Sequence, residues 1–389
     1  MASITVYPAT LRWAVSQSGT DPVAVSHKKG LAELPDWLNS VDPLRLSFSK
    51  LSDLGAALQM PFGSLVRSVV PEAHEDELVR YRTIDNHGVT PSRNLQDMIR
   101  IMRNRQDWAR DEMISQGFGE NLLVGSVPQH ASANELAAVI REGLDLESGW
   151  CRYKRNDERF RYLRAKASDA GLMVMVDSKV GTSNARRLDV HEFRAFVLLD
   201  DIAPLIFVNR NDAYAAMLFS LLHEIGHVLL GSSEVYNVMA FDADSVGEER
   251  IINQAVVLTV VDDEAEFRTY WKTTMDGNAR VQDVADDCAK RYGLSTLALT
   301  IYAHRLGLAS DEDVRVVRAA SELHVERVNT SSGGNQNTTN ASHLDTGFVR
   351  MIRDSVDRGG LSYSDGLSLL GIKSMHAYDG LLKEKGLNR

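Results

Sequence analysis

Residues 213–231 constrain the fold of this chain more than any other segment. Their apolar positions follow helical spacing, Asn211 or Asp212 can cap the beginning of the helix, and Gly231 can end it. Apolar residues surround the polar ones near the middle: Leu222, Ile225, Val228 and Leu229. We therefore expect a long helix held in a hydrophobic core, where the geometry of its polar side chains is fixed.

This helix carries the sequence His-Glu-Ile-Gly-His at residues 223–227. Residues four apart lie on one face of a helix, so the imidazoles of His223 and His227 can reach a single ion. Zinc binds imidazole and carboxylate ligands, and a catalytic zinc site has three protein ligands and one open position. Glu224 is displaced around the helix, where it can accept a proton from the water molecule that zinc activates. We expect Zn²⁺ on His223 and His227 with Glu224 as catalytic base; the alternative is two histidines on a helix surface.

A third ligand is expected from a following helix, where Glu248 and Glu249 are adjacent. Glu249 is preferred because it opens the sequence Glu-x-x-x-Asn. Asn253, one helical turn later, could then support a ligand histidine through a hydrogen bond. Glu248 stays open as the alternative ligand, and both glutamates could instead form a solvated first turn that the helix dipole favours.

The rest of the pattern predicts an α+β protein that is mostly helical. Predicted helices are several short ones within 9–70 and longer ones over 94–117, 133–141, 159–170, most of 245–325, and two or three after residue 342. Predicted strands cover residues 172–176, 192–199 and 205–208. The strand from Glu192 could be an edge that pairs with an extended peptide, or a central strand.

The composition excludes several classes of protein. A net charge of -10 argues against a protein that coats nucleic acid through bulk electrostatics, although a local DNA-binding face is still allowed. The two cysteines, Cys151 and Cys288, do not form a disulfide framework, which fits a reducing compartment. The chain shows no secretion signal and no apolar run near the ~20 residues that span a bilayer. We therefore expect a cytoplasmic protein without a membrane partner.

Several stretches, together with the metal motif, occur in a characteristic order. They are Arg105-Gln106-Asp107-Trp108, Arg187-Leu188-Asp189, Glu192-Phe193-Arg194-Ala195-Phe196, Ala203-Pro204-Leu205-Ile206-Phe207-Val208-Asn209, His223-Glu224-Ile225-Gly226-His227, Glu249-Arg250-x-x-Asn253, Ser332-Gly333-Gly334-Asn335 and Leu369-Leu370-Gly371. In these stretches the chain resembles the ImmA/IrrE family of zinc metallo-endopeptidases, in the long form fused to an N-terminal Xre-type helix-turn-helix. The metal motif is the most specific part of this resemblance.

The resemblance implies a domain order. We expect an Xre-type helix-turn-helix-like bundle at residues 1–70, a helical connector at 71–120, and a zincin-like metallopeptidase domain with a small sheet at 121–328. A glycine- and asparagine-rich loop and a small helical region would follow at 329–389. By position, the metal ligands of the family fall on His223, His227 and Glu249, and its catalytic base falls on Glu224.

The resemblance also implies the partners. Relatives cleave or inactivate repressor-like proteins, and some are encoded beside a small partner in toxin–antitoxin or phage-defence pairs. We therefore expect a zinc endopeptidase whose substrate is a repressor or a cognate antitoxin. The alternative is a regulator that does not cleave, with the peptidase-like domain as a sensor or binding platform and the N-terminal unit acting on DNA.

Two departures from the family pattern bear on these expectations. Residues 254–262 replace an alanine-rich stretch that usually ends in an acid and a proline, which puts substrate contacts near that helix in doubt. The expected recognition helix, residues 32–40, carries Glu33, Pro35 and Asp36 and has neither Arg nor Lys. DNA binding and protein contacts therefore both stay open for the N-terminal unit. The oxyanion-stabilising residue is equally open among Tyr214, Tyr236, His191 and Arg187.

Overall fold

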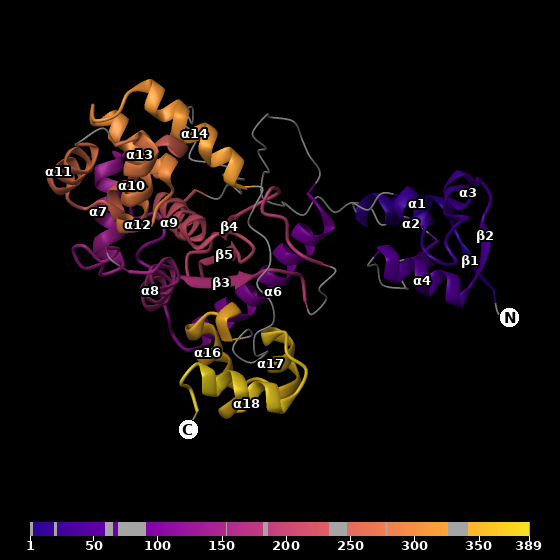
Figure 1. Cartoon of the computed structure of the whole chain (residues 1–389). Coiled ribbons are helices and arrows are strands. Elements are labelled where there is room, and N and C mark those ends of the chain that lie inside the picture. The colour runs from indigo at the N-terminus through magenta and orange to yellow at the C-terminus, as the bar shows by residue number, and fades with distance from the viewer. Residues whose placement is uncertain are drawn as a thin grey trace. The chain divides into compact units, whose positions relative to one another are not determined.

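The computed structural model describes residues 3–18, 22–58, 65–68, 91–152, 154–181, 186–232, 247–276, 279–325 and 341–388. The chain divides into two compact units. The first unit is Met1–Leu78 with Val89–Met98, and the second is Val79–Gly88 with Ile99–Arg389 (Figure 1). Residues 71–90 of the predicted connector and 329–340 of the predicted glycine- and asparagine-rich loop lie outside the described residues. Among the described helices, none is both long and apolar enough to cross a membrane.

The first unit combines short helices with a small sheet. Its elements are β1 (Ser3–Val6), α1 (Pro8–Ser18), α2 (Pro22–Ser26), α3 (Leu34–Asn39), β2 (Leu44–Ser47) and α4 (Phe48–Leu58). The short helices agree with the prediction, but the antiparallel pairing of β1 with β2 was not predicted. Its core includes Leu11, Leu34, Leu51 and Leu54, which are fully buried. The predicted recognition helix is reduced to the six residues of α3, whose Leu34 and Trp37 are buried.

The second unit is built on a three-stranded sheet of order β3-β5-β4. Strand β3 (Met173–Asp177) runs parallel to β5 (Leu205–Asn209), with Met173 opposite Leu205. Strand β4 (Ala195–Leu198) runs antiparallel to β5 at the other side. The three predicted strands are confirmed, but β4 is shorter than predicted because Phe193 N donates to Asp189 O in a turn.

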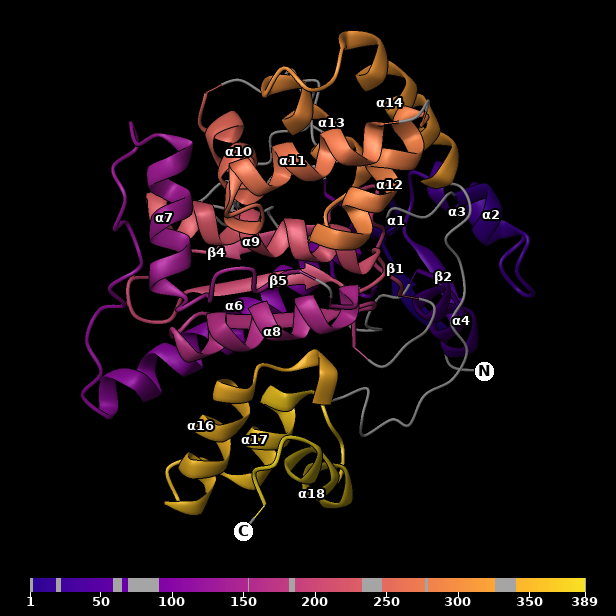
Figure 2. The ribbon, with the colours of Figure 1, turned by 60° about the vertical axis from the view of Figure 1, so that its left-hand side comes forward.

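Helix α9 (Tyr214–Leu230) packs on one face of this sheet (Figure 2). Val174, Val176, Ile206 and Val208 belong to the same buried cluster as the apolar residues of α9. Gln106, on α6 (Arg93–Ser115), donates to the backbone oxygens of Leu198, which ends β4, and Ala203, which precedes β5. Apolar side chains from strands and helices thus surround α9, which explains how it stays buried over nearly its whole length.

The remaining helices of the second unit enclose α9 and the sheet. They are α7 (Ala133–Gly143), α8 (Asn156–Asp169), α10 (Glu248–Val260), α11 (Glu264–Met275), α12 (Val281–Tyr292), α13 (Thr296–Arg305) and α14 (Asp311–Val325). Helix α10 packs against both α7 and α9. At the α9–α10 contact, a Cβ atom added to Gly226 would lie 2.8 Å from Ile252 Cγ2, so the glycine permits a close approach. The α+β, mostly helical fold is confirmed.

Three short helices end the chain: α16 (Thr346–Asp357), α17 (Tyr363–Leu370) and α18 (Met375–Glu384). Asp345 caps α16 and also accepts hydrogen bonds from Ser168 Oγ on α8 and Val174 N on β3. Arg164 on α8 donates to the backbone oxygens of Val174 and His343. These bonds attach the C-terminal helices to the sheet and α8. The three helices agree with the prediction of two or three after residue 342.

Candidate metal centre

Helix α9 places its polar residues deep in the protein. Gly231 ends the helix in the left-handed conformation, with φ of 65°, as the sequence predicts. The predicted cap at the other end is wrong, because Ala213 occupies the N-cap position without a side-chain bond. Asn211 instead donates to the backbone oxygens of Ser178 and Leu188, which lie in the loop after β3.

The two histidines of α9 point toward one another. Nε2 of His223 lies 3.1 Å from Nε2 of His227, and both side chains are 0% exposed. This burial excludes the alternative of two histidines on a helix surface. Two neutral imidazoles cannot place two lone pairs at this separation without a proton or a cation between them.

Glu249, in the first turn of α10, completes a group of three. Its Oε2 lies 3.3 Å from His223 Nε2, and its Oε1 lies 3.3 Å from His227 Nε2. The ligand atoms of His223, His227 and Glu249 all lie within 4.8 Å of one another. Among the described residues, this is the group of histidines and acids that could hold a metal ion.

The spacing of these atoms fits a tetrahedral ion. With zinc–ligand distances of about 2.0–2.1 Å, tetrahedral ligand atoms lie about 3.3 Å apart. The two Nε2 atoms are 3.1 Å apart, and each lies 3.3 Å from one Glu249 oxygen, His223 from Oε2 and His227 from Oε1. Glu249 Oε1 is also buried without a hydrogen-bond partner among the described residues. The donor set therefore fits zinc in both chemistry and size.

The outer nitrogens of the two imidazoles have different partners. His223 Nδ1 lies 3.1 Å from Asn253 Oδ1, the contact that the Glu-x-x-x-Asn spacing predicts. His227 Nδ1 lies 3.1 Å from Ser232 Oγ and 3.4 Å from Glu248 Oε1. Glu248 therefore contacts the nitrogen that faces away from His223. Ser232 was not anticipated, because a serine just beyond a helix end carries no recognisable signal.

The carboxylates and histidines of this cluster shift one another's pKa values. Burial lowers the pKa of His227, but Glu248 and Glu249 outweigh this and raise it to about 10. Burial also opposes ionisation of Glu249, yet the adjacent His223 and His227 side chains hold its pKa far below the usual range. Both shifts have one cause: the cluster stabilises positive charge at its centre.

Glu224 has a different environment from Glu249. It is 2% exposed, and its Oε2 has no hydrogen-bond partner among the residues that the structure describes. Burial raises its pKa to about 7, with His227 and His223 acting in the opposite direction. A carboxyl group with a pKa near neutrality can both accept and donate a proton under ordinary conditions.

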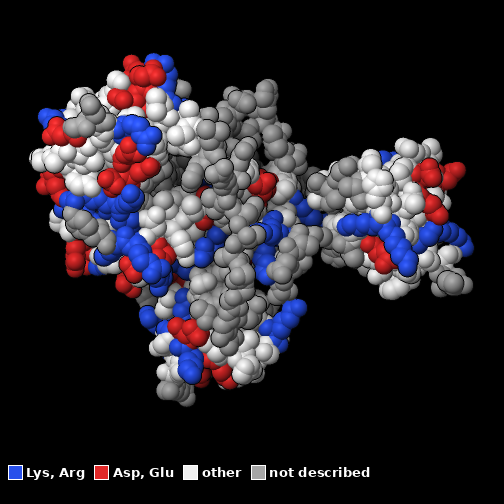
Figure 3. Space-filling view, in the orientation of Figure 1, with Lys and Arg blue, Asp and Glu red and all other residues white. Residues whose placement is uncertain are grey.

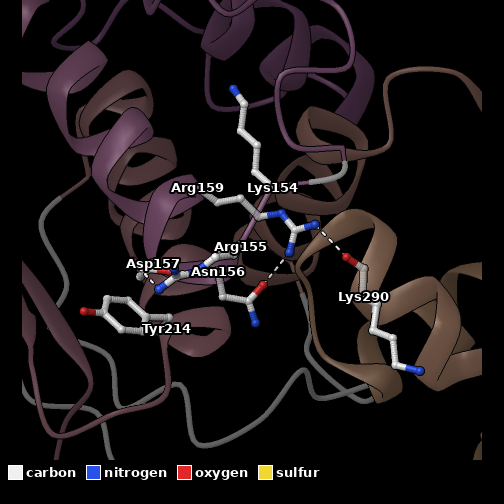
Figure 4. Close-up of a pocket in the computed structure, with 7 residues that line it drawn as sticks. All are labelled: Lys154, Arg155, Asn156, Asp157, Arg159, Tyr214 and Lys290. Carbon is white, nitrogen blue, oxygen red and sulfur yellow. Dashed lines mark hydrogen bonds and ion pairs between the residues drawn. The ribbon is translucent and has the colours of Figure 1, made fainter.

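The other predicted residues lie in different surroundings. Tyr214, at the start of α9, accepts a hydrogen bond from Arg210 and lines an open pocket of about 580 Å³ with Asn156, Arg159 and Lys290 (Figure 4). Lys and Arg side chains gather on this part of the second unit (Figure 3). Arg187 is exposed and donates to Asn211. His191 is also exposed, and Tyr236 lies outside the described residues.

Strand β4 is an edge of the sheet, since β5 pairs with it on one side only among the described strands. Within the described residues, the strand predicted after Glu192 is therefore an edge and not a central strand. Glu192 itself precedes the strand, which begins at Ala195.

Part of the chain matches a known protein family. Residues 167–304 match the model of the IrrE N-terminal-like domain, peptidase family M78, which is a family of zinc metallopeptidases with a zincin-like fold. This range includes His223, Glu224, His227, Glu249 and Asn253. No curated protein and no solved structure matches the chain. The match supports a relationship of this part of the chain to the ImmA/IrrE family.

Proposed function

We propose that the chain is a zinc endopeptidase in which His223, His227 and Glu249 bind the metal and Glu224 is the catalytic base. The observation that carries the proposal is the convergence of two imidazole nitrogens and one carboxylate within 4.8 Å, beside a second acid, Glu224, whose Oε2 has no hydrogen-bond partner among the described residues. A peptidase needs such a set: three ligands, an open position and a base. The match to a metallopeptidase family supports the same chemistry.

Each side chain of the site would have a separate role in peptide hydrolysis. A bound zinc ion would polarise the scissile carbonyl and lower the pKa of a water molecule to about 7. Glu224 would take the proton from the attacking water and return it to the leaving amine, a role that suits a buried acid whose Oε2 has no hydrogen-bond partner among the described residues. Asn253 would hold Nδ1–H of His223, so that Nε2 faces the ion.

We infer that the substrate is a specific regulatory protein, such as a repressor or a cognate antitoxin. The resemblance to the ImmA/IrrE family supports this, as does the need to restrain proteolysis inside a cell. The edge strand β4 offers backbone groups to an extended peptide. The N-terminal unit would supply a contact with the partner or with DNA.

The test is co-expression with the product of the neighbouring gene, followed by mass spectrometry for a new terminus. The wild-type chain should generate the terminus, and Glu224→Gln should lower the cleavage rate about 10²–10⁴-fold while zinc binding persists. Glu264→Gln, at an exposed acid in the first turn of α11, is the matched control and should cleave normally. An unchanged cellular effect of Glu224→Gln would instead favour the sensor or binding-platform function.

A further inference from the structure

The first turn of α10 carries two carboxylates that meet His227 at different nitrogens. Glu249 Oε1 is 3.3 Å from His227 Nε2, whereas Glu248 Oε1 is 3.4 Å from His227 Nδ1. Only Nε2 of His227 faces His223, at 3.1 Å. Adjacent acids of the same type therefore occupy different positions around the histidine, and they cannot have the same role.

Ser232 connects Glu248 to His227. Its hydroxyl donates to Glu248 Oε1 at 2.5 Å, and its Oγ lies 3.1 Å from His227 Nδ1. A serine hydroxyl has one proton and two lone pairs. The hydroxyl proton of Ser232 is directed at Glu248, so toward His227 the Ser232 oxygen can act only as an acceptor. The Glu248 carboxylate is likewise only an acceptor. Both neighbours of Nδ1 therefore favour the tautomer that carries the proton there.

The corresponding nitrogen of His223 meets a neutral group. Asn253 Oδ1, at 3.1 Å from His223 Nδ1, is an amide oxygen. A carboxylate that accepts from an imidazole increases the basicity of the other ring nitrogen more than an amide does, because the acceptor carries a full negative charge. The two histidines thus differ in the groups that accept from Nδ1, an amide for His223 and a carboxylate and a serine for His227, although their Nε2 atoms face the same point.

We propose that Glu248 and Ser232 are positioning residues that hold His227 with Nε2 free for the metal and make it the stronger imidazole ligand. This inference rests on the proposed function, since it assigns a role toward the zinc ion. It also assigns different roles to Glu248 and Glu249: Glu249 binds the metal, and Glu248 acts through His227.

Zinc affinities of the full chain test this assignment, measured by competition with a chromophoric chelator. Glu248→Ala should weaken binding about 10–100-fold. Ser232→Ala should weaken it less, because Glu248 still reaches Nδ1. Glu248→Gln keeps an acceptor without its charge and should lie between Glu248→Ala and the wild type. Glu264→Ala, which removes an acid from the first turn of α11, should bind zinc as the wild type does.

The visible spectrum of the Co²⁺-loaded proteins separates a positioning role from direct ligation. Glu248→Ala should retain one Co²⁺ per chain with tetrahedral-type bands, whereas Glu249→Ala should lose them. Equal zinc affinity of Glu248→Ala and the wild type would refute the inference, as would loss of the Co²⁺ bands in Glu248→Ala. A wild-type chain that binds no zinc would instead refute the proposed function. Thermal unfolding of the metal-free variants identifies any that fail to fold. If Glu248→Ala is one of these, the zinc affinities of Ser232→Ala and Glu248→Gln test the inference in its place.

Discussion

Two groups of buried charge lie in the second unit, and their surroundings differ. Arg159, on α8, is 1% exposed and donates to the backbone oxygens of Cys151, Lys290 and Arg291, and to Asn156 Oδ1. The close-up in Figure 4 shows two of these bonds, to Asn156 and Lys290. Around α9, by contrast, Glu224 Oε2 and Glu249 Oε1 are buried without a hydrogen-bond partner among the described residues.

This difference separates a structural charge from a functional one. Arg159 ties α8 to the end of α12 and to the segment before α8, and its hydrogen-bonding groups there are used. The acids near His223 and His227 keep bonding capacity that the described protein atoms do not fill. Such groups destabilise the fold unless a ligand binds them, so two of them beside a pair of buried histidines point to chemistry.

Replacing Arg159 should have the largest effect on stability. Arg159→Met keeps much of the volume but leaves the backbone oxygens of Cys151, Lys290 and Arg291 without this donor. We expect the free energy of unfolding to fall by about 3–5 kcal/mol. Urea unfolding of the metal-free chain, followed by circular dichroism, measures this. A loss below 1 kcal/mol would mean that the carbonyl groups find other donors and that the contrast with the metal centre is weaker than we infer.

Replacing Glu224 should act in the opposite direction. Glu224→Met removes a buried acid with an unpaired oxygen and supplies a side chain of similar length in an apolar core. The metal-free chain should gain about 1–2 kcal/mol of stability while cleavage is lost. The same urea experiment measures the gain. A clear loss of stability would show that Glu224 has structural partners, as Arg159 does.

Lys385 is a partly buried charge with fewer hydrogen-bond partners than Arg159 and more than Glu224 Oε2. Its Nζ donates to Leu344 O and Thr346 Oγ1, and burial, together with the nearby Arg164, lowers its pKa from 10.5 to about 8. Between these pH values the unfolded chain binds more protons than the folded one, so stability rises with pH. Relative to Lys385→Met, the wild type should gain about 1 kcal/mol from pH 7 to 10, reduced by its partial exposure. A difference that stays constant with pH would contradict this.

Local spacing in the sequence was enough to predict much of the site. The position of the other residues depends on how the helices pack against one another. His223, Glu224 and His227 could be placed on one buried helix because their spacing and apolar neighbours lie within a few turns. Glu249 could be preferred over Glu248 only through Asn253, since the rotation of α10 against α9 depends on contacts distant in sequence. Arg159 gave no signal, because its acceptors come from a loop and from α12.

The fold was predictable to a similar extent. Strands β3 and β5 are continuous apolar runs, and each was predicted nearly to its ends. The β1–β2 pair was not predicted, because each strand has four residues and their partners are separated by three helices. The cap of α9 was predicted wrongly because the Asn211 side chain is used by the loop after β3.

The contact between Gly226 and Ile252 limits which sequences can carry this site. The motif His-Glu-x-x-His leaves position 226 unspecified, yet even a methyl group there would collide with the Cγ2 methyl group of Ile252. Ile252 is three residues from Glu249 on the same helix, so a collision that moved α10 outward would also widen the gap between the carboxylate and the imidazoles. Position 226 is variable in the motif but requires glycine in this molecule. A larger residue could occupy it only if Ile252, across the interface, changed as well.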